Sequence, residues 1–294
     1  GTHGALMPAG AWMPFMVVQE IRIPTRRLRV LGIVLLASWT GACASHRQTL
    51  PSGPGSPFPD FEEAFTEVIT RYCNLNTVLA ELRLSGRVGD SRLRGRVLAG
   101  LAEPGAVRLE GLAPFGQPAF IFVAQPGRAA LLMPRESRAL VGQSAIDIVD
   151  ALTGIALTPD DLRYVLSGCL PDTVQARTGV SYGQDWWMIE TSDGSFVYLR
   201  LVGDVRRIVA VRRSGWLSEY SELSGRVPAQ VRLTSLNSAS GAVDLTVLLS
   251  QVRINTTLDA GTFVLDIPPD AVPMTLNELR ARGPLRASVE GAGR

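Results

Sequence analysis

The hydrophobic residues of the chain follow a helical spacing in one early segment and a strand spacing in most of the later ones. Between residues 60 and 72 they recur every three or four positions, which brings their side chains to one face of a helix. These apolar positions are Phe61, Phe65, Val68, Ile69 and Tyr72. Asp60 stands before them where a helix-capping residue belongs, so the pattern predicts a helix over residues 60–72.

From Val78 onward the hydrophobic spacing becomes two, the period of a strand with one buried face. It is clearest over residues 92–101, where apolar side chains alternate with Arg92, Arg94 and Arg96. Such an arginine row is compatible with anion binding, but a solvated strand face is the commoner arrangement and the one we favour. Further strands are predicted at residues 107–110, 120–124, 130–133, 173–178, 185–190, 196–202, 206–213, 230–235, 243–249, 252–258 and 263–267.

Two short helices are predicted to interrupt the strands. The first carries an apolar face and ends at Gly154. The second begins at Thr158, which is followed by proline and two acidic residues, the composition of a capped first turn. Its predicted buried residues are Leu162, Val165 and Leu166, and Gly168 ends it.

These elements together predict a mainly β (α+β) fold with an antiparallel sheet of about eleven strands. Because all-β domains of this length often stay undivided, residues 60–270 are expected to form one domain. A sheet of this size is expected to curl around an interior that helices or a ligand would fill. Residues 271–294 are assigned to a C-terminal tail.

The N-terminal residues have the features of a secretory signal. Arginine-rich residues 26–29 precede an apolar stretch, residues 30–39, that is too short to span a bilayer. Small residues then lead to Cys43, so the segment resembles a bacterial lipoprotein signal, in which the cysteine is acylated. An ordinary signal peptide followed by an incidental cysteine is the alternative. Residues 1–42 are assigned to upstream sequence and signal, and residues 43–59 to a lipid anchor and a Pro/Gly tether.

The composition excludes several kinds of chemistry. All 29 basic residues are arginine, and the two histidines, His3 and His46, precede the predicted domain. The domain therefore lacks the histidine and lysine that nucleophile activation, Schiff bases, P-loops and imidazole metal sites require. An enzyme using two carboxylates is still compatible with the composition, but no cluster of acids stands out. We expect no enzymatic activity, no metal and no cofactor.

The basic charge of the chain belongs to its N-terminal segment. Residues 1–42 contain Arg22, Arg26, Arg27, Arg29 and Glu20, so removing them turns the formal net charge of +2 into −1. A balance of this kind does not support nucleic-acid binding.

Two cysteines, Cys73 and Cys169, remain when Cys43 is lipidated. An even pair in an oxidising compartment favours a structural disulfide. Their separation does not have the Cys-x-x-Cys spacing of a redox dithiol. The alternative is two buried free thiols.

Residues 107–172 resemble the lipoprotein-localisation family of LolB and, more loosely, LolA. The stretch that ends in Pro114-Phe115-Gly116 matches a family strand that ends in Pro-Leu-Gly. Residues 152–154, Leu-Thr-Gly, match a family helix end, and residues 162–168 match a following Leu-Arg-x-x-Leu-x-Gly helix. The cysteine, the tether and the first helix match in order as well.

The resemblance implies an incompletely closed antiparallel β-barrel with helices covering a hydrophobic cavity. In that family the cavity takes the acyl chains of lipoproteins, and the leucine of the Pro-Leu-Gly loop protrudes toward the membrane. By this match Pro114, Phe115 and Gly116 would form a membrane-inserting loop. The alternative is that Phe115 folds inward as core.

The implied function is that of a lipid-anchored, periplasm-facing monomer of the outer membrane, which binds acyl chains of lipoproteins and helps to insert them. Its partners would be lipidated proteins or other acyl lipids and a periplasmic LolA-like carrier. The alternative is an envelope assembly lipoprotein that uses the same fold as a protein-interaction module. An open apolar cavity would favour the first function, and an interior filled with side chains would favour the second.

Overall fold

The computed structural model describes residues 49–113, 117–236 and 242–285. Cys43 and the proposed loop residues Pro114, Phe115 and Gly116 lie outside these ranges. The described residues belong to one compact unit. None of their helices is long and apolar enough to cross a membrane.

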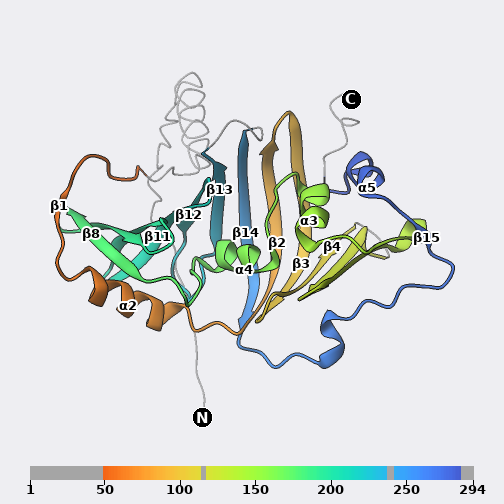
Figure 1. Ribbon diagram of the computed structural model, residues 1–294, viewed down its shortest axis with the longest axis horizontal. Coiled ribbons are helices and arrows are strands. Elements are labelled where there is room, and N and C mark those ends of the chain that lie inside the picture. The colour runs from red at the N-terminus through yellow and green to blue at the C-terminus, as the bar shows by residue number, and fades with distance from the viewer. Residues whose placement is uncertain (1–48, 114–116, 237–241, 286–294) are drawn as a thin grey trace, which may run out of the picture. The chain divides into compact units, whose positions relative to one another are not determined.

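The described residues form one sheet of fifteen strands (Figure 1). The strands are β1 Ser56–Pro57, β2 Thr77–Val88, β3 Ser91–Ala102, β4 Ala106–Gly111, β5 Phe120–Gln125, β6 Arg128–Met133, β7 Arg138–Val141, β8 Ala176–Tyr182, β9 Trp186–Thr191, β10 Phe196–Val202, β11 Val205–Arg213, β12 Trp216–Ser221, β13 Gln230–Ser235, β14 Val243–Ile254 and β15 Val272–Pro273. Their order is β1-β8-β9-β10-β11-β12-β13-β14-β2-β3-β4-β5-β6-β7-β15, and β15 pairs with β7 in parallel while the other pairs are antiparallel.

The mainly β class is therefore confirmed, but the predicted barrel is not. The sheet stays open, with β1 and β15 at its two ends. Each end strand has only two residues, and one of these is a proline, Pro57 or Pro273. Proline has no N–H to donate to a further strand, and short edges discourage pairing, so both features oppose closure.

The helices are α2 Phe61–Tyr72, α3 Ala145–Thr153, α4 Pro159–Ser167 and α5 Leu276–Arg282, with 3₁₀ turns η1 Pro134–Glu136 and η3 Ala260–Phe263. Helices α2, α3 and α4 lie where the sequence predicts, whereas α5 lies in the segment assigned to the tail. Asp60 precedes α2 but makes no side-chain capping hydrogen bond. Thr158 forms a capping box with Asp161 at the start of α4. Gly154 and Gly168 end α3 and α4 in the left-handed conformation that glycine adopts without strain.

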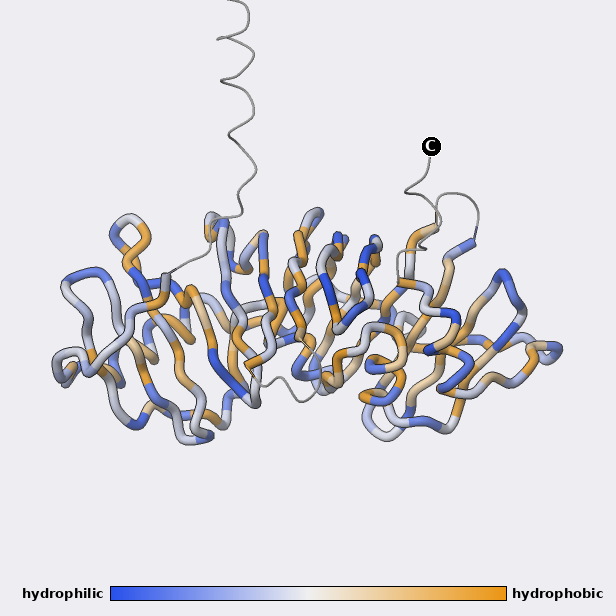
Figure 2. The backbone as a smooth tube through the Cα atoms, turned by 90° about the horizontal axis from the view of Figure 1, so that it is seen from above, coloured by the Kyte–Doolittle hydropathy of each residue, from blue (hydrophilic) through white to orange (hydrophobic). Residues whose placement is uncertain are grey.

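The two faces of the sheet differ in what covers them. On the inner face, alternate strand residues such as Leu82, Val97 and Leu109 form one apolar cluster with residues of α2, α3, α4 and α5. The other face, here called the outer face, carries a small separate cluster around Tyr198 and Val209. Figure 2 shows the alternation of hydrophobic and hydrophilic residues along the strands that produces this division.

The segment after residue 270, which the sequence analysis sets apart as a tail, packs against the sheet and helix α3. Leu279 of α5 is fully buried in the inner cluster. Arg280 pairs with Asp150 of α3 at 2.9 Å, and Glu278 pairs with Arg138 of β7 at 2.6 Å. These contacts place residues 272–285 within the folded unit.

Two predicted strands are wrong. Residues 252–258 do not form a strand of their own, because β14 continues to Ile254 and residues 255–258 belong to no strand. Residues 263–267 alternate as a strand does, but the structure has the turn η3 followed by an extended segment there. Side chains of the sheet satisfy its carbonyl groups. Arg108 donates to Thr262 O and Val264 O, both at 3.2 Å, and Gln125 donates to Phe263 O at 2.9 Å.

Candidate functional site

A small cavity of about 150 Å³ lies between helix α4 and strands β11 and β12 on the inner face. It is called the α4 pocket below. Its lining residues are Ala156, Leu157, Asp161, Tyr164, Val165, Cys169, Val211, Arg213, Ser214, Trp216, Ser218 and Tyr220. Its wall is mixed: apolar side chains such as Leu157, Val165 and Val211 alternate with polar groups, and the charged residues Asp161 and Arg213 lie together at 3.4 Å.

Tyr220 and Gly168 show how closely α4 approaches the sheet. Tyr220 of β12 is 2% exposed. A Cβ added to Gly168, at the end of α4, would come within 3.6 Å of the Tyr220 ring, and the positive φ of 76° also favours glycine there. Burial raises the pKa of the Tyr220 hydroxyl, so the phenol stays neutral in this wall.

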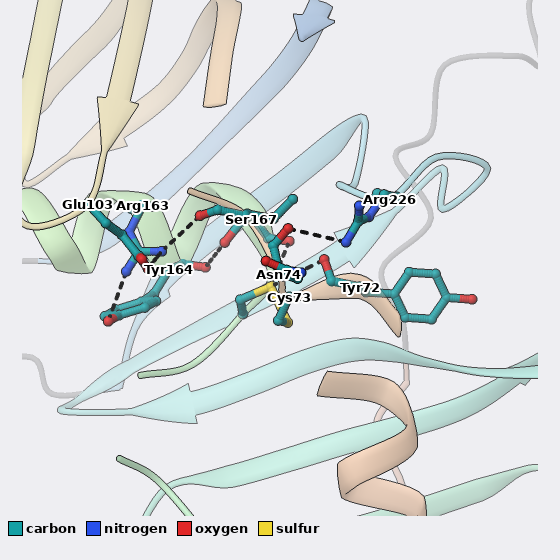
Figure 3. Close-up of a disulfide and its surroundings, with 10 residues drawn as sticks. Tyr72, Cys73, Asn74, Glu103, Arg163, Tyr164, Ser167 and Arg226 are labelled. Carbon is teal, nitrogen blue, oxygen red and sulfur yellow. Dashed lines mark hydrogen bonds and ion pairs between the residues drawn. A yellow bond between two sulfur atoms is a disulfide. The ribbon is translucent and has the colours of Figure 1, made fainter. Parts of the chain in front are cut away.

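A buried arginine, Arg163, attaches helix α4 to Glu103 and to the backbone of Leu75. The hydrophobic periodicity of the sequence does not identify this residue. Arg163 is 6% exposed, whereas Leu162 and Val165, two of the residues predicted to be buried, are only half-buried. The Arg163 guanidinium pairs with Glu103 at 2.5 Å and donates to Leu75 O at 3.3 Å (Figure 3). The inner side of α4 therefore contains a polar attachment beside its apolar contacts.

The other side of α4 is held by Arg213 of β11. Its guanidinium lies between Asp161 at 3.4 Å and Asp193 at 3.1 Å. Burial alone would raise the pKa of Asp193, but hydrogen bonds from Thr191, Ser195 and Arg213 outweigh it and lower that pKa. Asp193 therefore stays ionised at neutral pH and keeps Arg213 in place.

A disulfide joins the C-terminal end of α4 to the end of α2. It links Cys73 to Cys169, with Cα atoms 5.5 Å apart (Figure 3). These are the two cysteines that the sequence analysis paired. Nearby, Arg226 donates to Asn74 O at 3.2 Å. The end of α4 thus has little freedom to leave α2, whereas its start is held by side-chain contacts.

The groups around the α4 pocket suit apolar binding better than covalent chemistry. Within the described ranges, no three histidine, cysteine or acidic side chains gather into a metal-binding group. Cys169 is in a disulfide, and Ser218 and Tyr220 lie in the wall without a histidine or lysine to activate them. The apolar part of this lining can contact an apolar portion of a ligand. The volume of the α4 pocket, however, is below the range of about 300–1,000 Å³ that is common for ligand pockets.

At about 150 Å³ the α4 pocket, which is formed by described residues, is smaller than the hydrophobic cavity that the resemblance implies. A wider cleft of about 740 Å³ lies elsewhere, along β5, β6 and β7 beside Phe263, Val264 and Leu265. Its wall includes the exposed residues Val141 and Val264.

Comparisons with known proteins give the following. No family model and no curated protein matches the chain. A protein of Vibrio parahaemolyticus described as an outer membrane lipoprotein-sorting domain is similar over 69% of this chain and 95% of its own, at 14% identity and a TM-score of 0.44. A LolA superfamily protein of Nitrosomonas europaea is similar over 69% and 96%, at 11% identity and a TM-score of 0.45. The Mycobacterium tuberculosis lipoprotein LppX is similar over 68% and 98%, at 11% identity and a TM-score of 0.30.

The structural neighbours of the chain thus include proteins described as lipoprotein-sorting and LolA-superfamily proteins. At these identities and TM-scores the similarity assigns no role to the residues of this chain.

Proposed function

We propose that the protein binds an acyl chain on the inner face of its sheet, with the α4 pocket as the point at which the chain enters. The observation that carries this proposal is a partly apolar space already present between α4 and the sheet, next to the main hydrophobic cluster. Each methylene buried there would contribute about 0.8 kcal/mol. Binding of this kind needs no catalytic group.

A long acyl chain requires α4 to move, because the pocket is small. The contacts of α4 favour a hinge at its C-terminal end, where Cys169 is bonded to Cys73. The start of the helix is held by the ion pair of Asp161 with Arg213, a partly exposed contact of the kind worth up to about 1 kcal/mol. The middle of the helix is held more firmly, because the buried Arg163 pairs with Glu103. Movement of α4 must therefore break this pair as well, and the burial of several methylenes is needed to offset that cost.

The cellular part of the proposal comes from the sequence. Cys43 would carry the lipid anchor, and the protein would face the periplasm from the outer membrane. There it would receive acyl chains of lipoproteins from a LolA-like carrier and pass them on. Leu112, next to the proposed loop of Pro114, Phe115 and Gly116, donates to Arg96 O at 2.8 Å, so the base of that loop lies beside strand β3.

The test is binding of a fluorescent sixteen-carbon fatty acid to the purified chain. Val211→Phe places a larger side chain in the α4 pocket and is expected to weaken binding at least tenfold, because the space for the chain is filled. Val202→Phe, on an exposed part of β10, is the matched control and should leave binding unchanged. Equal binding by all three proteins would contradict the proposal.

A second candidate is the assembly module, and the small volume of the α4 pocket favours it. If the wild-type chain binds no fatty acid, and thermal unfolding shows that it is folded, the interior serves only as a core. The protein would then act through its surfaces.

A further inference from the structure

The outer face of β2 and β3 carries five exposed arginines. Arg83 and Arg87 lie on β2, and Arg92, Arg94 and Arg96 on β3. These residues, together called the arginine face, point away from the inner cluster because they alternate with its buried residues. Arg96 pairs with Glu81 at 2.6 Å. In the part of the chain that the structure describes, the other four have no ion pair.

The strand register places these arginines against one another. Arg83 is opposite Arg96, and Arg87 is opposite Arg92. On the other side of β2, Arg87 is opposite Asp244 of β14, which pairs with Arg232 at 2.6 Å. Like charges at directly opposed positions destabilise a sheet. A merely solvated face would be more stable with acids at half of these positions. The arrangement therefore fits a surface whose positive charge is neutralised by a ligand.

Two leucines accompany the arginines on the same face. Leu98 of β3 is 42% exposed, and Leu248 of β14, which is opposite Arg83, is 37% exposed. A groove of about 620 Å³ runs along the outer face, with Leu79, Leu98 and Val252 in its wall. Two acids and two arginines also line this groove, Glu81, Glu110, Arg108 and Arg253. The face thus combines positive charge with apolar side chains that water does not favour.

We propose that the arginine face, with Leu98 and Leu248, docks on the surface of an anionic phospholipid bilayer. Guanidinium groups bind phosphate through paired hydrogen bonds, which the fork of an arginine matches better than a lysine ammonium. The leucines would contact the acyl boundary between headgroups, as apolar residues of interfacial segments do. An acidic protein would match the arginines but would not need the exposed leucines beside them, so the bilayer is the better match.

This surface is separate from the α4 pocket, because it lies on the opposite face of the sheet. Its test is therefore independent of the proposed function. The variants described next should bind fatty acid as the wild type does. If only fatty-acid binding or only vesicle binding is absent, the absent activity identifies the proposal that fails.

The experiment is sedimentation of the full chain with vesicles, in a Cys43→Ser background so that no acyl anchor contributes. Vesicles of phosphatidylcholine are compared with vesicles that contain one third phosphatidylglycerol. The test variant is Arg83→Gln, Arg92→Gln and Arg94→Gln together. Its matched control, with the same change in charge, replaces Arg128, Arg177 and Arg200, which are exposed elsewhere.

The wild type should bind the anionic vesicles, and the test variant should bind them about a hundredfold more weakly, since an arginine near such a surface contributes about 1 kcal/mol. The control should stay within about threefold of the wild type. Leu98→Gln with Leu248→Gln should weaken the binding that remains at high salt, because apolar contact is not screened.

Two results would overturn the proposal. One is that the wild type binds anionic vesicles no better than neutral ones, which would leave the arginine face to an acidic protein or to solvent. The other is that the control variant loses as much binding as the test variant, which would show that only net charge matters. Circular dichroism of every variant establishes that it is folded.

Discussion

The disulfide between Cys73 and Cys169 should supply a large share of the stability of the fold. The two residues are separated by 96 positions. In the chain-entropy model, closing a loop of this length lowers the conformational entropy of the unfolded chain. This raises the free energy of the unfolded state by about 4.7 kcal/mol. Domains of this kind have total stabilities of about 5–15 kcal/mol, so the double variant Cys73→Ala/Cys169→Ala should be near its unfolding limit.

The measurement is urea unfolding followed by tryptophan fluorescence, with and without a reducing agent. The free energy of unfolding is compared with that of the wild type without reducing agent. It should fall by similar amounts, roughly 3–5 kcal/mol, in the reduced wild type and in the double variant. The reducing agent should not affect the double variant, which is the control for its other effects. The slope of unfolding against urea should rise in both, because an open unfolded chain exposes more surface. A loss below about 1 kcal/mol in both would refute the reasoning.

Three further predictions concern α4 and its neighbours, and urea unfolding checks each of them. Thr158→Ala should lower the free energy of unfolding by about 1 kcal/mol, because the capping box is lost. Gly168→Ala should lower it by about 1–2 kcal/mol, because alanine is strained at a φ of 76°. An unchanged free energy of unfolding in both variants would contradict the cap geometry. Glu103→Gln should cost about 2 kcal/mol because it leaves the Arg163 charge buried, and adding Arg163→Met should recover most of that loss. The pKa of Asp193 is lowered in the fold, so its stabilising effect is present above the ordinary Asp pKa near 4 and disappears as the pH falls through the lowered value. In Asp193→Asn the free energy of unfolding should therefore decrease less steeply as the pH is lowered. An unchanged decrease would assign the pH dependence to other groups.

Local signals in the sequence were sufficient for the helices. The helix α4 begins at Thr158 and ends at Gly168 because capping and left-handed glycine geometry depend on residues within one turn. Strand alternation is a local signal of the same kind. It places the neighbouring residues Trp186 and Trp187 of β9 on opposite faces of the sheet. Trp187 is in the inner cluster and Trp186 in the outer one.

Features that depend on distant partners could not be predicted. Strand β12 was missed because Ser218 occupies one of its buried positions, which weakens the apolar alternation. The end strands β1 and β15 have two residues each and exist only through their pairing with β8 and β7. Arg163 reads from sequence as an exposed helix residue, and its burial depends on Glu103, which lies 60 positions away in the chain.

The two proposals place different tasks on opposite faces of one sheet, and this has a consequence for how cargo would reach the protein. If the arginine face lies on the bilayer, α4 and its pocket face away from the membrane. An acyl chain would then arrive at the pocket from the periplasmic side, as delivery by a soluble carrier requires, rather than from the bilayer itself. Transfer onward would proceed past the end of strand β4 near Leu112, whose N–H donates to Arg96 O of strand β3.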